Sequence, residues 1–197
     1  MAMTGVFGFD AYAADSSTLY LTPSGGSYVV GDTFSVSIKV YSGDIAINAA
    51  EGILHFTSDT VEVESVSKDN SIFTLWTEDP AYSNEMGTLR FSGGLPHPGY
   101  TGSQGTVLDL IFRVKNTGAA TMNFSDARIL ASDGKGTNVL AGTGGGSYVG
   151  TYREALAVRK LGRSLYPFVI ALISVLMAIS IVSAFYFIKR AKSGSKN

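Results

Sequence analysis

The two histidines are the residues best suited to acid–base or metal chemistry, and neither has the neighbours that such chemistry needs. His55 lies in an alternating stretch, and His97 lies between two prolines. Neither has a nucleophile or a carboxylate at a spacing typical of a catalytic site. The 16 acidic residues are scattered, so no pair of glycosidase carboxylates stands out. We therefore expect a protein that is not an enzyme, with no catalytic residue and no cofactor.

Cysteine chemistry is excluded because the chain contains no cysteine. This removes disulfides, thiolate nucleophiles and cysteine metal sites. The segment Ser132–Asn138, SDGKGTN, has some likeness to a calcium loop, but it lacks the repeated acids and the terminal glutamate of an EF-hand. We expect a turn stabilised by the Asp133 and Asn138 side chains, with no metal ion.

Four ring-bearing residues could form a platform for a ligand. They are Trp76, Tyr82, His97 and Tyr100, and the last two lie in a stretch rich in glycine and proline. Flat aromatic faces suit sugar rings or the apolar patch of a partner protein. The alternative, which we favour, is that Trp76 fills the hydrophobic core.

The distribution of charge argues against a nucleic-acid partner. Residues 18–150 carry 13 acidic and 7 basic residues, whereas residues 151–197 carry 1 acidic and 8 basic residues. A nucleic-acid-binding body needs a basic face to neutralise phosphates, and this body is acidic. The basic C-terminal part suits an anionic membrane surface instead.

The elements that must position these residues are short strands. Alternating apolar and polar residues, separated by turn signals, recur through residues 18–151, and no amphipathic helix interrupts them. This pattern predicts an all-β antiparallel sandwich of about nine strands. The expected strands are Thr18–Thr22, Thr33–Tyr41, Ile47–Phe56, Val61–Ser67, Ile72–Trp76, Thr88–Ser92, Thr106–Lys115, Ala120–Phe124, Arg128–Ala131 and Ser147–Thr151. We expect Pro23–Gly26, Thr77–Glu85 and Gly93–Gly102 to be turns or loops.

Four stretches, in this order and spacing, resemble a cohesin domain. They are LYLTPSGGSYVVGDTFSVSIKV, INAAEGILHFTSDTVEVESVS, GTVLDLIFRVK and FSDARILASDGKGTNVL, and the resemblance covers Leu19–Gly150. It is closest to divergent cohesin-like domains of bacterial envelope proteins. The resemblance implies a jelly-roll sandwich.

The same resemblance implies a binding function. Cohesins bind dockerin modules, and their contact face includes the strand that corresponds to Asn48–Phe56. The outward residues of this strand, Ala49, Glu51, Ile53 and His55, are therefore the expected partner-binding row; the alternative is that Glu51 and His55 are simply solvated. Related sandwiches bind carbohydrate, so a polysaccharide ligand and a purely structural adhesion role are the alternatives to a dockerin-like partner.

An uncharged stretch of 24 residues, Leu165–Ile188, predicts a transmembrane helix. At ~1.5 Å per residue it would be about 36 Å long, and a bilayer core needs about 20 such residues. Pro167 falls in the first turn, where a missing N–H costs little. We therefore expect a basic juxtamembrane linker at 152–164, a span at 165–188 and a basic tail at 189–197.

The first 17 residues bear on the topology. Ala11-Tyr12-Ala13 fits a signal-peptidase site, but no basic residue precedes it and the apolar run is short. The segment is either the end of a secretory signal or an ordinary N-terminus. Basic residues flank the span four against four, with the tighter cluster on the C-terminal side. We expect the sandwich outside the cell and the tail in the cytoplasm.

Overall fold

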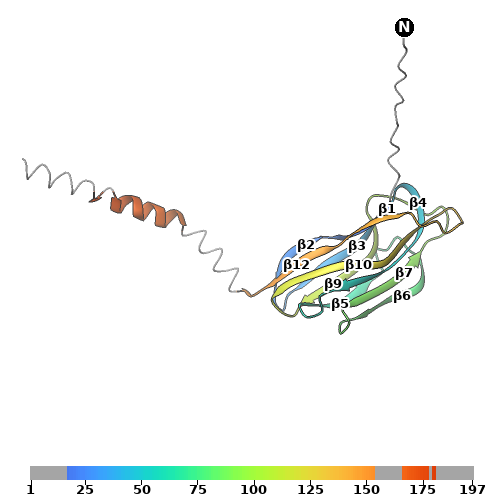
Figure 1. Ribbon diagram of the computed structural model, residues 1–197, viewed down its shortest axis with the longest axis horizontal. Helices are drawn as coiled ribbons and strands as arrows, with labels where there is room; N and C mark the ends of the chain where they lie inside the picture. Colours follow the sequence, from blue (N-terminus) through green and yellow to red (C-terminus); the bar gives the residue numbers. More distant parts are fainter. Residues whose placement is uncertain (1–16, 154–165, 178, 181–197) are drawn as a thin grey trace, which may run out of the picture. The chain divides into compact units, whose positions relative to one another are not determined.

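The computed structural model describes residues 17–153, 166–177, 179 and 180. The chain divides into two units, Met1–Thr151 and Tyr152–Asn197. The first unit contains every strand that the structure describes, and Figure 1 shows these strands in two layers. The strands are β1 (Ser17–Thr22), β2 (Gly25–Val29), β3 (Thr33–Tyr41), β4 (Gly43–Phe56), β5 (Val61–Ser67), β6 (Leu75–Ser83), β7 (Thr88–Gly94), β8 (Tyr100–Gly102), β9 (Gly105–Val114), β10 (Gly118–Ala131), β11 (Leu140–Gly144) and β12 (Gly146–Thr151).

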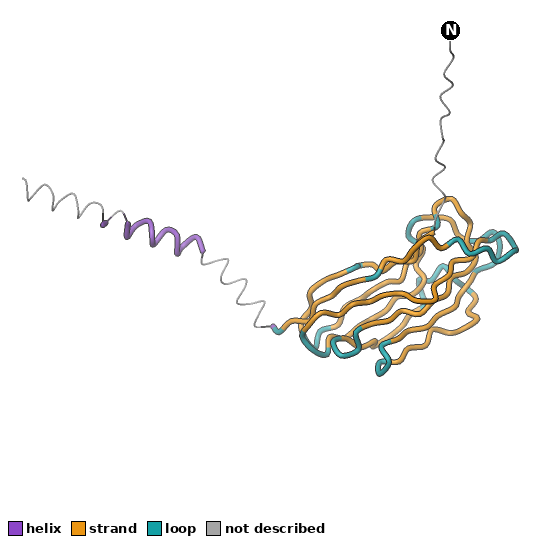
Figure 2. Tube along the Cα trace, in the orientation of Figure 1, coloured by secondary structure: helices purple, strands orange, loops and turns teal. Residues whose placement is uncertain are grey.

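The strands form two sheets, which confirms the predicted β-sandwich. One sheet has the order β11-β1-β3-β9-β5, and the other has the order β2-β12-β10-β4-β7-β6, with β8 added to β4. Most neighbours are antiparallel, but β1 pairs with β11 and β2 pairs with β12 in parallel. Figure 2 shows strand through most of this unit, with loops at the ends of the sheets.

The core lies between the sheets and follows the alternation of the sequence. In β3, the inward residues Phe34, Val36, Ile38 and Val40 are buried, and the residues between them face solvent or are half-buried. Strands β4, β9 and β10 contribute their own inward rows, which include Leu54, Phe112 and Ile129. The body thus buries its apolar rows without a disulfide.

The strand count is higher than expected, because several irregular strands are hard to detect. Most of the expected loop Thr77–Glu85 belongs to strand β6. The first three residues of the expected strand Ile72–Trp76 lie before β6 begins. Gly25 and Gly26 begin β2, β8 lies within the expected loop Gly93–Gly102, and β11 was not expected. These are edge strands or short glycine-rich pieces, which need no regular alternation of apolar and polar residues. The two strands expected at 120–131 form one strand, β10, interrupted by a bulge.

The second unit contains a helix at residues 166–177. Only part of the predicted span Leu165–Ile188 lies within the described residues, and Leu165 and Ile188 lie outside them. Among the residues that are described, no helix is both long enough and apolar enough to cross a membrane. The N-terminal residues 1–16 also lie outside the described residues, and so does the linker from residue 154 onward.

Candidate binding face

The predicted row on β4 points outward. Ala50, Leu54 and Phe56 are buried on the inner side of the strand together with Gly52. The residues between them, Ala49, Glu51, Ile53 and His55, therefore lie on the outer surface of the sheet, as the alternation predicts. They are half-buried except for His55, which is exposed. Their role in binding stays a prediction.

The strand register places this row at the centre of a four-strand surface, which we call the front face. It consists of the outward residues of β6, β7, β4 and β10, in four rows across the sheet. Read from β6 to β10, the rows are Ser83, Thr88, His55 and Asn123; Ala81, Arg90, Ile53 and Ser125; Glu78, Ser92, Glu51 and Arg128; and Leu75, Gly94, Ala49 and Leu130. The face therefore changes from uncharged polar, through charged, to apolar along the strands.

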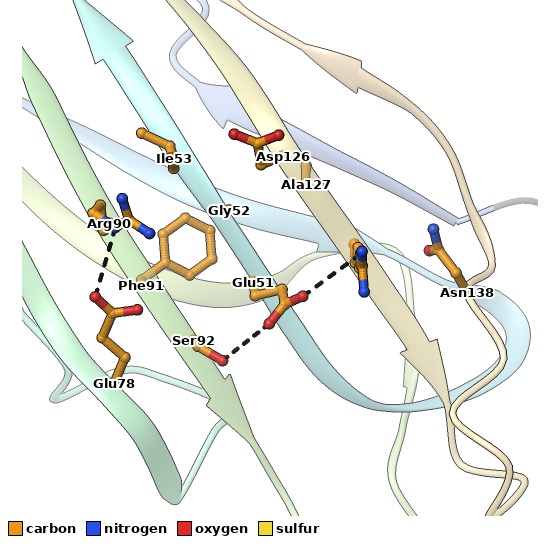
Figure 3. Close-up of a pocket in the computed structure, with 11 residues that line it drawn as sticks. Glu51, Gly52, Ile53, Glu78, Arg90, Phe91, Ser92, Asp126, Ala127 and Asn138 are labelled. Atoms are coloured by element: carbon orange, nitrogen blue, oxygen red, sulfur yellow. Dashed lines mark hydrogen bonds and ion pairs between the residues drawn. The ribbon is translucent and has the colours of Figure 1, made fainter.

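Glu51 lies at the centre of the charged part (Figure 3). Its carboxylate lies 3.7 Å from Arg128 Nε and accepts a hydrogen bond of 3.4 Å from the Ser92 hydroxyl. The Thr77 hydroxyl donates to Ser92 Oγ at 2.8 Å, which extends the network to β6. Arg90 Nε and Glu78 form a second ion pair at 3.7 Å. All four charged side chains are substantially exposed, so these pairs add little stability and can exchange partners with a ligand.

A bulge in β10 shapes the floor of this region. Asp126 and Ala127 together stand opposite Gly52, and Asp126 has a φ of 50°. Because of this extra residue, Ala127 packs toward the core while Asp126 borders the outer surface. A depression of about 540 Å³ lies here, between Glu51, Ile53, Arg90, Asp126 and Arg128.

A second depression occupies the apolar end of the front face. It measures about 320 Å³, and Ala49, Leu75, Gly94, Leu95 and Leu130 line it together with Glu51. Leu75 is 58% exposed, which is unusual for a leucine on an edge strand. The lining is mainly apolar and open, so it can accept an aliphatic side chain of a partner.

His55 shows no sign of catalytic or metal-binding chemistry. Its Nε2 lies 2.8 Å from the Ser125 hydroxyl, which is a contact between exposed residues on neighbouring strands. Within residues 17–153 and the described part of the helix, no three histidine, aspartate or glutamate side chains come together as metal ligands.

The predicted turn at Ser132–Asn138 is confirmed. The Asp133 carboxylate accepts hydrogen bonds from the Lys135 amide at 2.8 Å and from the Thr137 hydroxyl. The Thr137 bond first, and then the amide bond, lower the pKa of Asp133 below its ordinary value. Asn138 Oδ1 accepts from the Leu140 amide at 3.2 Å, so both side chains stabilise the turn as expected.

The four residues that could have formed an aromatic platform lie in different parts of the structure. Trp76 stands opposite Gly93 on the inner side of β6 and packs edge-on against Phe73, with ring centroids 6.2 Å apart. The Lys68 ammonium lies 5.5 Å from the Trp76 ring and covers its outer side. Trp76 is thus half-buried against the core, which agrees with the alternative that we favoured.

The other three residues of that set lie elsewhere. Tyr82 stands opposite Leu89, four residues from Gly93 and roughly 13 Å away at ~3.3 Å per residue. Tyr100, on β8, stands opposite Ile47 on β4. His97 is exposed in the loop before β8. Among the described residues, no ring contact joins any two of the four.

Sequence reasoning missed the partners of the β4 row. Arg90, Arg128, Leu75 and Leu130 join the front face only through the strand register, which the sequence does not reveal. The bulge at Asp126 also has no clear sequence signal, although the interruption expected between Phe124 and Arg128 marks its place.

Comparison with known proteins decides the fold. The sequence matches no family model, and no curated protein matches it significantly. Among solved structures, the seventh ScaB type I cohesin from Pseudobacteroides cellulosolvens aligns with a TM-score of 0.57 at 19% identity, over 70% of this chain and 93% of the other. The body has the cohesin fold.

Two further structures support this assignment. A non-cellulosomal cohesin from the hyperthermophilic archaeon Archaeoglobus fulgidus aligns with a TM-score of 0.55 at 18% identity, over 73% of this chain and 97% of the other. A type I cohesin–dockerin complex from Clostridium thermocellum, Coh-OlpC–Doc435, aligns with a TM-score of 0.56 at 17% identity, over 73% of this chain and 100% of the matched chain. The cohesin-like body therefore corresponds to nearly the whole of these chains.

Proposed function

We propose that this chain is a non-catalytic module that recruits a dockerin-like partner protein through its front face. One observation carries the proposal: a cohesin-like sandwich presents the outward row of β4 at the centre of a four-strand surface. The sequence resemblance points to the same strand as the partner contact. A fold alone does not define a function, so the proposal depends on this surface.

The solved structures support the class of partner. Several of the similar structures are complexes of a cohesin with a dockerin, including Coh-OlpC–Doc435 and CaDoc0917–CaCohA2. The front face provides what a protein partner needs, which is an apolar contact flanked by hydrogen-bonding groups. The apolar depression beside Leu75 would take an aliphatic side chain. Glu51, Arg128 and Arg90 would exchange their weak mutual pairs for bonds to the partner.

A matched pair of substitutions tests the proposal. Ile53→Asp puts a charge at the centre of the front face, whereas Ile111→Asp makes the same change on the outer surface of β9 in the opposite sheet. With a panel of purified dockerin modules in isothermal titration calorimetry, we expect at least one to bind. Ile53→Asp should then weaken binding more than tenfold, because it replaces a central apolar contact with a charge that binding must desolvate. Ile111→Asp should change the affinity less than twofold.

Two outcomes count against this function. If no dockerin in the panel binds, the proposed class of partner is wrong. If both variants weaken binding equally, the contact does not lie on the front face. Thermal unfolding of each variant, followed by circular dichroism, confirms that the sandwich remains folded.

We also propose that the module is anchored in a membrane and displayed outside the cell. The support is the uncharged stretch Leu165–Ile188 and the basic residues that follow it. When intact cells that express a C-terminally tagged chain are treated with protease, we expect loss of the body and survival of a small tagged fragment. A full-length band, with a surface control cleaved and a cytoplasmic control intact, would contradict surface display.

A further inference from the structure

The sheet opposite the front face also presents aromatic residues outward. We call its outer surface the back face; it consists of the outward residues of β1, β3, β9 and β5. Tyr20 on β1 stands opposite Lys39, and Tyr41 on β3 stands opposite Thr18. The two tyrosines are therefore diagonal neighbours on one surface, at a spacing of about 7–8 Å between backbones.

Tyr20 leans across the sheet. Its hydroxyl donates a 2.9 Å hydrogen bond to the carbonyl oxygen of Ser103, which lies just before β9. Ser103 lies in the loop between β8 and β9, and β3 lies between β1 and β9, so the Tyr20 side chain extends from β1 toward the β3 side. On the other side of β1, strand β11 offers Gly142 opposite Thr18 and Gly144 opposite Tyr20, so no side chain from these positions covers the ring. The aromatic ring thus lies along the surface.

Glycines leave room for the neighbouring tyrosine rings. Gly43 and Gly102 are paired across β4 and β8. The Tyr41 hydroxyl lies 3.2 Å from where a Cβ on Gly43 would be, and the Tyr100 hydroxyl lies 2.7 Å from where a Cβ on Gly102 would be. Each of these two rings thus folds back over one glycine of the pair. Burial first, and then the proximity of Tyr100, raise the pKa of Tyr20.

Hydrogen-bonding groups continue from the tyrosines along the back face. Lys39 lies between Tyr20 and Thr106 in one row of the sheet. Within the part of the chain that the structure describes, Lys39 forms no ion pair with an acidic residue. In the next row, Asp109 accepts hydrogen bonds from the Ser37 hydroxyl at 2.6 Å and the Asn70 amide at 2.9 Å. The surface combines an open aromatic area with fixed donors and acceptors.

We propose that the back face binds a polysaccharide chain on Tyr20 and Tyr41. A sugar ring has an apolar face that stacks on an aromatic ring and an equatorial rim of hydroxyls that need donors and acceptors. Tyr41 is 42% exposed and Tyr20 is half-buried, so each leaves part of its ring open to a sugar. Lys39, Thr106 and the Ser37–Asp109 pair would bond the hydroxyls. An open surface suits the interior of a long chain better than a free monosaccharide.

This site is separate from the front face, because the two surfaces lie on the outer sides of different sheets. A bound polysaccharide would leave the front face available to a partner protein. The inference therefore does not depend on the proposed function, and either can fail alone.

Native affinity electrophoresis of the full-length chain in mild detergent tests the proposal. The gels contain soluble xylan, mixed-linkage β-glucan, glucomannan, hydroxyethylcellulose or starch. We expect at least one polysaccharide to retard the wild-type chain. Tyr41→Ala and Tyr20→Ala should each weaken the retardation at least tenfold. Tyr20→Phe should retain most of it, because the ring remains.

The chain offers a closely matched control. Tyr82 on β6 is 44% exposed, almost the same as Tyr41, but it belongs to the other sheet. Tyr82→Ala and Ile53→Asp should both bind polysaccharide as the wild type does. Absence of retardation by every polysaccharide would overturn the proposal. The proposal would also be overturned if Tyr41→Ala left the retardation unchanged, or if Tyr82→Ala reduced it as much as Tyr41→Ala. A protein partner that requires Tyr20 and Tyr41, while no polysaccharide binds, would overturn it as well.

Discussion

At the scale of single residues, Tyr148 shows how one side chain joins distant parts of the sandwich. Its ring is only 1% exposed and lies 5.2 Å from the Phe34 ring and 6.5 Å from the Tyr28 ring. Its hydroxyl donates a 2.6 Å hydrogen bond to the carbonyl oxygen of Pro23, in the turn between β1 and β2. Burial first, and then Tyr28, raise the pKa of Tyr148 to about 12.

This raised pKa predicts a loss of stability in alkali. An unfolded tyrosine ionises near pH 10, whereas folded Tyr148 stays neutral until about pH 12. Its contribution to the free energy of unfolding is therefore complete below pH 10 and is lost as the pH rises from 10 to 12. Tyr148→Phe should lower the free energy of unfolding by about 1 kcal/mol at pH 7 and make it fall less steeply above pH 10. Urea unfolding at several pH values measures both effects, and equal slopes for the two proteins would contradict the assignment.

Sequence reasoning predicted the outward orientation of the β4 row correctly, because alternation alone decides it. Glu51 and Ile53 were placed on the outer surface because Ala50, Leu54 and Phe56 form the inner row. The partners of Glu51 could not be foreseen, since Arg128 depends on the β4–β10 register and on the two-residue bulge within it. Tyr20 and Tyr41 lie in correctly predicted strands, but their diagonal placement on one surface depends on the β1–β3 register.

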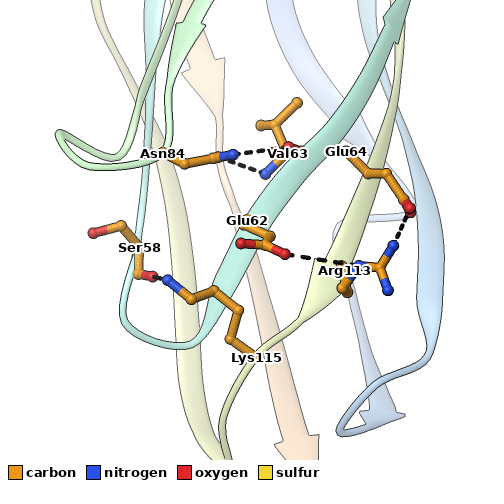
Figure 4. A network of polar contacts seen from close by, with 7 residues as sticks. All are labelled: Ser58, Glu62, Val63, Glu64, Asn84, Arg113 and Lys115. Atoms are coloured by element: carbon orange, nitrogen blue, oxygen red, sulfur yellow. Dashed lines mark hydrogen bonds and ion pairs between the residues drawn. The ribbon is translucent and has the colours of Figure 1, made fainter.

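At the scale of elements, the edge strand β5 is protected by one amide side chain. Asn84, in the turn between β6 and β7, accepts a 2.7 Å hydrogen bond from the Val63 amide and donates a 2.9 Å bond to the Val63 carbonyl oxygen (Figure 4). It thus occupies the place that a neighbouring strand would take. Arg113 on β9 pairs with both Glu62 and Glu64, which adds charge to the same edge. Such features block edge-to-edge pairing with another chain.

Removing this amide should weaken both the fold and the protection of the edge. Asn84→Ala leaves two half-buried backbone groups without their partners, so we expect a loss of about 1–3 kcal/mol in the free energy of unfolding. Asn70→Ala, which removes one hydrogen bond between exposed side chains, should cost less. Urea unfolding measures the first effect, and light scattering at rising protein concentration measures the second. An Asn84→Ala protein as stable and as monomeric as Asn70→Ala would contradict this account.

The elements that the sequence did not predict are those with least regular alternation. Strand β6 contains Pro80 and two register shifts, so its outward and inward residues do not alternate. Strands β2 and β11 are rich in glycine and pair in parallel at the margins of the sheets. Propensity is weak in such segments, and only the surrounding structure makes them strands. The long regular strands β3, β4 and β9 were recognised because each buries a full apolar row.

At the scale of the whole molecule, the sandwich places two different surfaces back to back. The front face joins an apolar depression to a group of weak ion pairs, whereas the back face is mainly polar with Tyr20 and Tyr41 at one end. The chain could thus hold a partner protein and a polysaccharide together. If the anchor functions as proposed, both would be confined to the cell surface.

Two outward-facing isoleucines, one on each face, allow binding at the front face to be tested directly. We would label the isoleucine δ1-methyl groups of the full-length chain with ¹³C and titrate it with the tightest-binding dockerin of the calorimetric panel. If the partner binds the front face, we expect a large chemical-shift change or broadening for Ile53 and an unchanged signal for Ile111. The reverse pattern, with Ile111 perturbed and Ile53 unchanged, would show that the partner binds the other sheet and would contradict binding at the front face.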